Sequence, residues 1–126
     1  MSGRITITVG GISAEAELND SPCAEAIYQA LPITSAANTW GQEVYFDIGV
    51  SCELADSARQ DMAVGEVGYW PVGRALCIFF GRTPASGADG APKAASDVNP
   101  VGRIVGDAGV FKSVGDGDKI VLATGS

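Results

Sequence analysis

The sequence contains no histidine among its 126 residues. This absence excludes Ser-His-Asp and Cys-His catalytic arrangements, histidine general-base catalysis near neutral pH, and histidine-ligated metal sites. Cysteine is also scarce: Cys23, Cys52 and Cys77 are far apart and include no CxxC pair. Such an odd, dispersed set is typical of reduced thiols rather than of a zinc site or a disulfide framework. We therefore expect a cytoplasmic protein without a metal or other cofactor.

Basic residues are few as well. Eight Lys and Arg stand against fifteen Asp and Glu, which gives a formal net charge of −7. Nucleic acids and anionic membranes attract clustered basic residues, so we predict that neither is a partner. No apolar run is long enough to span a bilayer, and the start MSGRITITV lacks the apolar segment of a signal peptide.

The composition that remains fits a single domain over residues 1–126. Hydrophobic residues make up 46% and glycine contributes 17 positions, which favours many turns between short strands. Residues 4–9 (RITITV) alternate between apolar and polar, and residues 14–18 (AEAEL) do so again. Gly10 and Gly11 lie between them and suit a tight turn, so these two segments predict an antiparallel hairpin.

A single helix is expected over residues 22–31. Ser21 can cap it, Pro22 suits its first position, and an apolar residue recurs every fourth position until Pro32. Strands are then expected at 33–37, 43–48, 66–70 and 75–81, the last buried on both faces, before the segments 101–106, 109–114 and 119–123 finish the chain. Residues 86–96 (SGADGAPKAAS) read as a mobile loop. The pattern predicts a mainly β fold, a barrel or sandwich of about eight strands.

Four segments carry a resemblance to a known family: WGQEVYF, GEVGYWPVGRALCIFFGRTPAS, NPVGRIVGD and VGDGDKIVLA. With the order of hairpin, helix and further strands, they resemble the small prokaryotic cyclophilin-like domains over residues 5–123. The resemblance implies a closed eight-stranded barrel with one or two short helices. That family has no established activity, so the resemblance implies a fold rather than a reaction.

True cyclophilins isomerise X-Pro bonds with an arginine that hydrogen-bonds the prolyl nitrogen, in a Phe-His-Arg motif on the strand after the first helix. The matching strand here, ITSAA, offers Thr34 and Ser35 and no arginine. The next segment, EVYFDI, lacks the Gln and the Gly pair of the second cyclophilin motif. The resemblance therefore carries no catalytic residue to this chain, and we expect a groove without catalysis.

Aromatic residues supply candidate walls for such a groove. Trp40, Tyr45, Tyr69 and Trp70 combine a large apolar area with a polar atom, which suits cleft walls and interfaces. Packing at the ends of the barrel is the alternative for all four. Tyr45 lies on the strand face opposite Val44, and Trp70 ends its strand before Pro71.

The ligand-binding candidates are Tyr45, Trp70 and Phe79 as apolar walls, with Arg82 and Asn99 as polar groups that orient the ligand. The guanidinium of Arg82 can bind a carboxylate or a backbone carbonyl. A structural ion pair or plain exposure is the alternative for Arg82. Glu43 and Asp47 share a strand face but lie too far apart along it for one retaining hydrolase site.

We therefore expect a binding module for a small molecule or an extended peptide. Two alternatives stay open: a weak or altered prolyl isomerase, and a subunit of a larger amide-processing assembly, which an exposed apolar patch would indicate. An oligomer is compatible with all three.

Overall fold

The N-terminal hairpin forms as its alternating pattern predicts. A computed structural model of the protein describes residues 3–125, in which β1 (Gly3–Val9) pairs antiparallel with β2 (Ile12–Leu18). Ile5 and Ile7 are fully buried on the inner face of β1. Gly10 in the turn has a φ of 58°, a left-handed conformation that favours glycine.

Within residues 3–125 the sheet contains ten strands, two more than the approximate number that the sequence predicted. The others are β3 (Ile33–Ala36), β4 (Asn38–Thr39), β5 (Glu43–Asp47), β6 (Arg59–Asp61), β7 (Glu66–Trp70), β8 (Ala75–Phe79), β9 (Lys93–Val105) and β10 (Lys119–Thr124). Nine follow the order β3-β10-β1-β2-β9-β7-β8-β5-β4, and β6 pairs with β9 beside this path.

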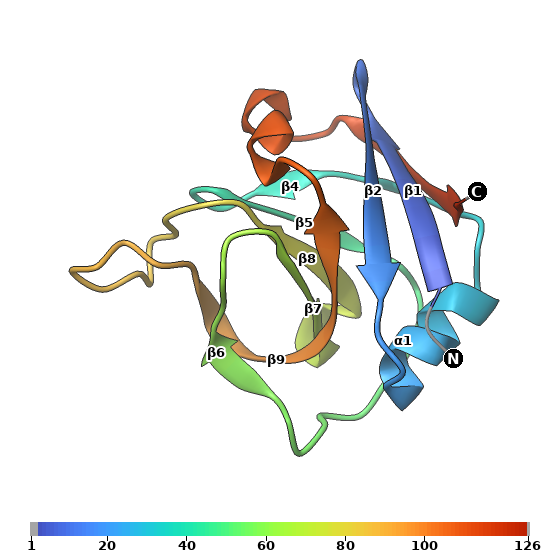
Figure 1. Ribbon diagram of the computed structural model, residues 1–126, viewed down its shortest axis with the longest axis horizontal. Helices are drawn as coiled ribbons and strands as arrows, with labels where there is room; N and C mark the ends of the chain where they lie inside the picture. The colour runs from blue at the N-terminus through green and yellow to red at the C-terminus, as the bar shows by residue number, and fades with distance from the viewer. Residues whose placement is uncertain (1–2, 126) are drawn as a thin grey trace.

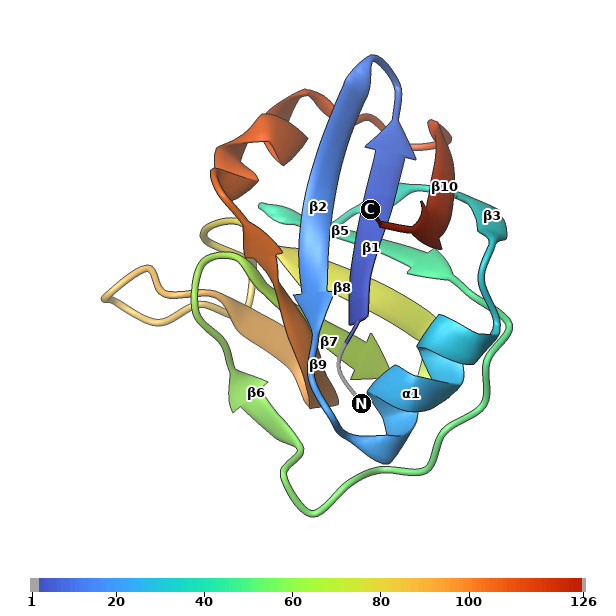
Figure 2. The same ribbon diagram turned by 45° about the vertical axis from the view of Figure 1, so that its right-hand side comes forward.

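This strand order makes the sheet curl back on itself like a barrel. The two end strands, β3 and β4, are separated only by Ala37, although no ladder joins them within residues 3–125. In Figure 2, β1 and β2 pass in front of β5 and β8, so the two parts of the sheet enclose the core between them. The fold is mainly β and barrel-like, as the family resemblance implied.

Helix α1 (Pro22–Gln29) begins where the sequence predicts and ends two residues earlier than the expected Leu31. The Ser21 hydroxyl accepts a hydrogen bond from the Ala24 N–H at 3.2 Å, which caps the first turn. Pro32 disfavours the helical conformation in Leu31, and this explains the early end. The segment 109–114 lies largely in a 3₁₀ helix, η2 (Ala108–Ser113), while η1 (Pro71–Gly73) connects β7 to β8.

Strand β9 is longer than the sequence indicated. The prediction of a loop over residues 86–96 is wrong for its last four residues, because β9 begins at Lys93 and continues to Val105. Its C-terminal part pairs with β2 and β7, and its N-terminal part pairs with the unpredicted β6. Figure 1 shows β9 bending between these two pairings. The sequence did not indicate this part of the strand, because Ala and Lys are depleted in strands and the segment has the composition of a loop.

Strand β8 is buried on both faces, as predicted. Leu76 and Ile78 belong to the main core, which also contains α1, β1 and β10. Cys77 and Phe79 point the other way, into a smaller cluster with Met62, Ala94 and Val98 that lies beneath β6 and the start of β9. This second face positions the candidate site.

Candidate functional site

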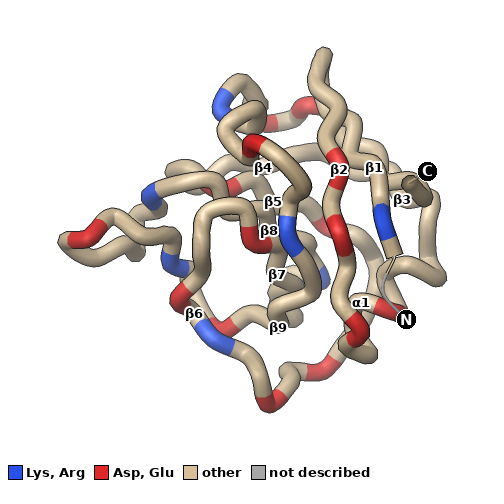
Figure 3. Tube along the Cα trace, in the orientation of Figure 1, with Lys and Arg blue, Asp and Glu red and all other residues tan. Residues whose placement is uncertain are grey.

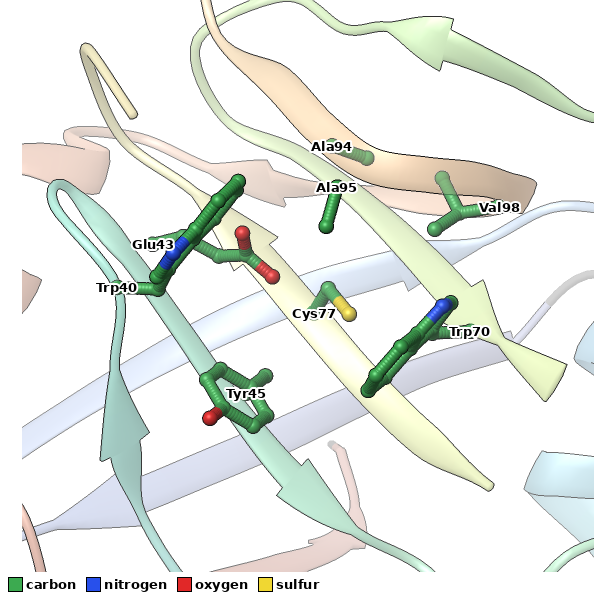
Figure 4. Close-up of a pocket in the computed structure, with 8 residues that line it drawn as sticks. All are labelled: Trp40, Glu43, Tyr45, Trp70, Cys77, Ala94, Ala95 and Val98. Carbon is green, nitrogen blue, oxygen red and sulfur yellow. The ribbon is translucent and has the colours of Figure 1, made fainter. Parts of the chain in front are cut away.

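A cavity of about 190 Å³ lies on the outer face of β5, β7 and β8, beneath the first residues of β9. Figure 4 shows that its lining comes from this layer on one side and from the start of β9 on the other. The lining residues are Trp40, Glu43, Tyr45, Trp70, Cys77, Ala94, Ala95 and Val98. The cavity therefore combines three aromatic rings, a carboxyl group and a thiol within a mainly apolar wall.

Two of the aromatic rings are held against each other. Tyr45 and Trp70 meet edge to face, with ring centroids 6.4 Å apart and ring planes at 86°. The indole N–H of Trp70 donates a hydrogen bond to the Ser96 hydroxyl at 2.8 Å, which links β7 to β9. A Cβ at Gly73 would lie 2.9 Å from the Trp70 ring, so glycine is needed there for this ring position. These contacts fix the orientation of the Trp70 ring, which forms one wall of the cavity.

Trp40 approaches the cavity from the turn between β4 and β5. Its backbone N–H donates to the Glu43 carbonyl at 3.0 Å, and Gly41 between them has a φ of 61°. A Cβ at Gly41 would lie 2.8 Å from Pro84, so this turn packs closely against the segment after β8. Trp40 itself is half-buried and borders the cavity beside Glu43.

Glu43 is the buried acid of the site. Its exposed fraction is only 5%, and burial raises the pKa of its carboxyl group from 4.5 to about 7. A hydrogen bond with Cys77 opposes part of that pKa rise. Within residues 3–125 no Lys or Arg forms an ion pair with Glu43. The carboxyl group is therefore buried without a counter-charge and is half protonated near neutral pH.

Cys77 is a poor nucleophile in this setting. Burial raises the pKa of its thiol well above 9.0, and the nearby Glu43 raises it further. The thiolate is the reactive form of cysteine, so this thiol stays protonated and unreactive near neutral pH.

The predicted site residues do not all lie together. Tyr45 and Trp70 come together in the cavity, while Phe79 is fully buried and packs in the smaller cluster beside it. Arg82 does not line the cavity: its exposed side chain lies beside Gly90. Its backbone N–H donates to the Gln42 side chain at 3.1 Å, so this part of the chain borders the Trp40 turn.

Asn99 lies apart from the cavity and fixes a loop. Its amide donates to the Glu53 carbonyl at 2.9 Å and its side-chain oxygen accepts from the Ala55 N–H at 2.8 Å. The side chain is 2% exposed and lines a separate hollow beside the start of α1. Its side-chain oxygen and its amide nitrogen both bind loop backbone, which points to a structural role in holding residues 53–55.

Sequence reasoning did not assign Glu43 and Cys77 to a site. The strand pairing brings them together: Glu43 lies opposite Phe79, and Tyr45 lies opposite Cys77. The alternation of residues 43–47 does place Glu43 and Tyr45 on one face, which was the available signal. The burial of that face depends on β9, which was expected to be a loop at this point.

Two further features bear on function. Within residues 3–125 no group of three or more His, Cys, Asp or Glu residues is arranged to hold a metal ion. None of the helices in that range has both the length and the apolar character needed to cross a bilayer.

Comparison with known proteins identifies the family. The family described as Cyclophilin-like matches residues 3–123. The solution structure of the hypothetical protein AF2241 from Archaeoglobus fulgidus is similar, with 37% sequence identity and a TM-score of 0.83. That match covers 98% of this chain and 95% of the archaeal one. No curated protein sequence matches significantly. The match over nearly the whole length, together with the barrel-like strand order, shows that this chain belongs to the cyclophilin-like family.

Proposed function

We propose that the protein is a binding module whose cavity holds a small molecule and catalyses no reaction on it. The observation that carries the proposal is the lining: a buried carboxyl group surrounded by Trp40, Tyr45 and Trp70. Ligand sites are typically concave, mostly apolar, and provided with a few polar groups that set orientation. The size of the cavity favours a small molecule over an extended peptide.

The absence of catalysis is part of the proposal. Thr34 and Ser35 lie on β3, where the family resemblance places the cyclophilin arginine, and both are short and neutral. Twisting the prolyl imide is favoured by a hydrogen bond to its nitrogen, which an arginine can donate. We expect no acceleration of isomerisation on an X-Pro peptide. A rate enhancement of several orders of magnitude that disappears in Arg82→Ala would replace this proposal with a relocated active site.

The binding proposal can be tested through intrinsic fluorescence. Trp40 and Trp70 are the only two tryptophans of the chain, and both line the cavity. Any ligand that enters should therefore change the emission without a background from tryptophan elsewhere. We expect hits from a library of small fragments, with the signal assigned by the variants Trp40→Phe and Trp70→Phe. If no fragment changes the emission or the melting temperature, the binding proposal is wrong.

A further inference from the structure

The ionisable groups that line the cavity are all acids. They are the carboxyl group of Glu43, the phenol of Tyr45 and the thiol of Cys77, and no Lys or Arg is among the lining residues. Basic residues are also sparse elsewhere, and Figure 3 shows them scattered over the chain trace with acidic residues among them. A ligand that enters the cavity therefore meets negative or neutral groups only.

Glu43 differs from another glutamate that has a partner. Glu66, at the start of β7, forms an ion pair with Arg59 at 2.6 Å, and this contact lowers the pKa of Glu66. Glu43 is more deeply buried and has no such partner within residues 3–125. An ionised carboxylate buried without a counter-charge is costly, so a cation that entered the cavity would remove this cost.

The aromatic walls favour the same kind of ligand. The faces of Trp and Tyr rings attract cations through the ring quadrupole, and the attraction strengthens when the cation is desolvated. Trp40 lies beside Glu43, and Tyr45 and Trp70 line the cavity beyond Cys77 (Figure 4). A carboxylate together with three aromatic rings can replace the hydration of a small organic cation from several sides.

Other classes of ligand match this lining less well. An anion would find no positive side chain and would be repelled by Glu43 when that group is ionised. An uncharged apolar ligand would fill the space but would leave the carboxyl group desolvated. We propose that the cavity binds a small organic ammonium ion, with Glu43 as its counter-charge and the rings of Trp40, Tyr45 and Trp70 around it. This inference rests on the proposed binding function.

The volume limits the size of the ammonium ion. A cavity of about 150 Å³ holds a benzene-sized molecule, so about 190 Å³ accommodates a cation with fewer than roughly ten non-hydrogen atoms. Choline and butylammonium are both within this limit. They differ in the number of N–H donors, so together they cover methylated and primary ammonium ions.

The test compares each cation with an uncharged molecule of matched shape. Choline is paired with 3,3-dimethylbutan-1-ol, in which carbon replaces the nitrogen, and butylammonium is paired with 1-butanol. The acid 3,3-dimethylbutanoate serves as the anion. We expect at least one cation to bind about tenfold or more tightly than its uncharged counterpart, and the anion to bind more weakly than both.

A charge-neutral variant identifies the counter-charge. Glu43→Gln keeps the shape of the side chain and removes its charge, so the affinity for the preferred cation should fall about tenfold or more. The affinity for the uncharged counterpart should change less than about twofold. Glu53→Gln is the matched control, because Glu53 is exposed and does not line the cavity. It changes the net charge equally and should leave both affinities unaltered.

The pH dependence of choline binding provides a second readout. Choline keeps its charge at every pH, so a change in affinity reports groups of the protein. With a Glu43 pKa of about 7, the ionised fraction rises from about a tenth at pH 6 to about nine-tenths at pH 8. Choline affinity should rise about tenfold over this range if choline is the cation that binds. The ionisable groups facing Glu43 are Tyr45 on β5 and Cys77 on β8, since the lining residues from β7 and β9 do not titrate.

The outcomes separate this inference from the binding proposal. If uncharged molecules bind as tightly as the cations, or if Glu43→Gln leaves cation affinity unchanged, the ammonium inference is overturned while the binding function stands. If no probe and no library fragment binds, both fail. Tighter binding of a cation, its loss in Glu43→Gln and its retention in Glu53→Gln would support the inference.

Discussion

The side chains of Leu76 and Ile78 project from one face of β8 into the closed apolar core. Those of Cys77 and Phe79 project from the opposite face into a smaller cluster that borders the cavity. The inner face packs against the rest of the barrel. The outer face of β8 packs against Met62 and the start of β9, in a cluster with fewer apolar residues than the main core. The difference shows how one strand can stabilise the barrel on one side and line a cavity on the other.

The polar content of the two faces differs in the same way. Glu43, Thr83 and Asn99 are the buried polar or charged residues within residues 3–125, and Glu43 lies in the outer layer beside Cys77. A buried polar group reduces stability unless it is paired. The inner face therefore contributes mainly apolar packing, whereas the outer face carries a buried carboxyl group beside the cavity.

The largest expected effect is a truncation on the inner side. Phe46 is fully buried on β5, opposite Leu76. Phe46→Ala should lower the free energy of unfolding by about 3–5 kcal/mol, because lost apolar burial and a residual cavity add together. Urea denaturation measures this change. Val72→Ala is the control, since Val72 is 80% exposed, and should change stability by less than about 0.5 kcal/mol. A loss below about 1 kcal/mol for Phe46→Ala would contradict a closed core.

The next effect concerns the pH dependence of stability and belongs to the outer face. The folded-state pKa of Glu43 is raised from 4.5 to about 7, so between these values the folded protein binds more protons than the unfolded chain. Stability should therefore fall as pH rises from about 4.5 to 7, by on the order of 3 kcal/mol from this group.

Glu43→Gln tests this assignment, because glutamine does not titrate. Denaturation of the wild type and the variant at pH 5 and pH 8 should show a smaller loss of stability with rising pH in the variant. Equal losses in the two proteins would mean that Glu43 titrates normally and is not held in a desolvated site.

A matched pair of valines compares the two faces directly. Val67 on β7 is 0% exposed and packs in the main core, while Val98 on β9 is 1% exposed and lines the cavity. Val67→Ala should cost about 2.5 kcal/mol and Val98→Ala about 1.5 kcal/mol. The removed methyl groups leave a new void in the closed core, whereas at Val98 they only enlarge an existing cavity that solvent can enter. Equal costs would show that the outer layer is packed as tightly as the core.

Local patterns predicted the inner face well. The β1–β2 hairpin, the start of α1 and the double burial of β8 follow from alternation, capping residues and an apolar run, all of which act over a few residues. The outer face depends on contacts between distant segments. Glu43 is buried because β5 pairs with β8 and because residues 94–98 lie over that pair. The loop-like composition of residues 93–96 concealed the start of β9, so the burial of Glu43 and the cavity could not be predicted from the sequence.

The smallest expected effect concerns how firmly β9 is held over the cavity. The hydrogen bond from the Trp70 indole to Ser96 joins the two walls at 2.8 Å, but Ser96 is exposed. Trp70→Phe keeps an aromatic ring and removes this donor, so it should cost about 1 kcal/mol, the net value of one hydrogen bond in partial contact with water. A double-mutant cycle with Ser96→Ala isolates the bond from the change in ring size. A coupling energy near zero would mean that the packing of Val98 and Ala94, and not this bond, holds the start of β9 over the cavity. A coupling close to 1 kcal/mol would mean that this bond contributes to holding β9 against β7 on this side of the cavity.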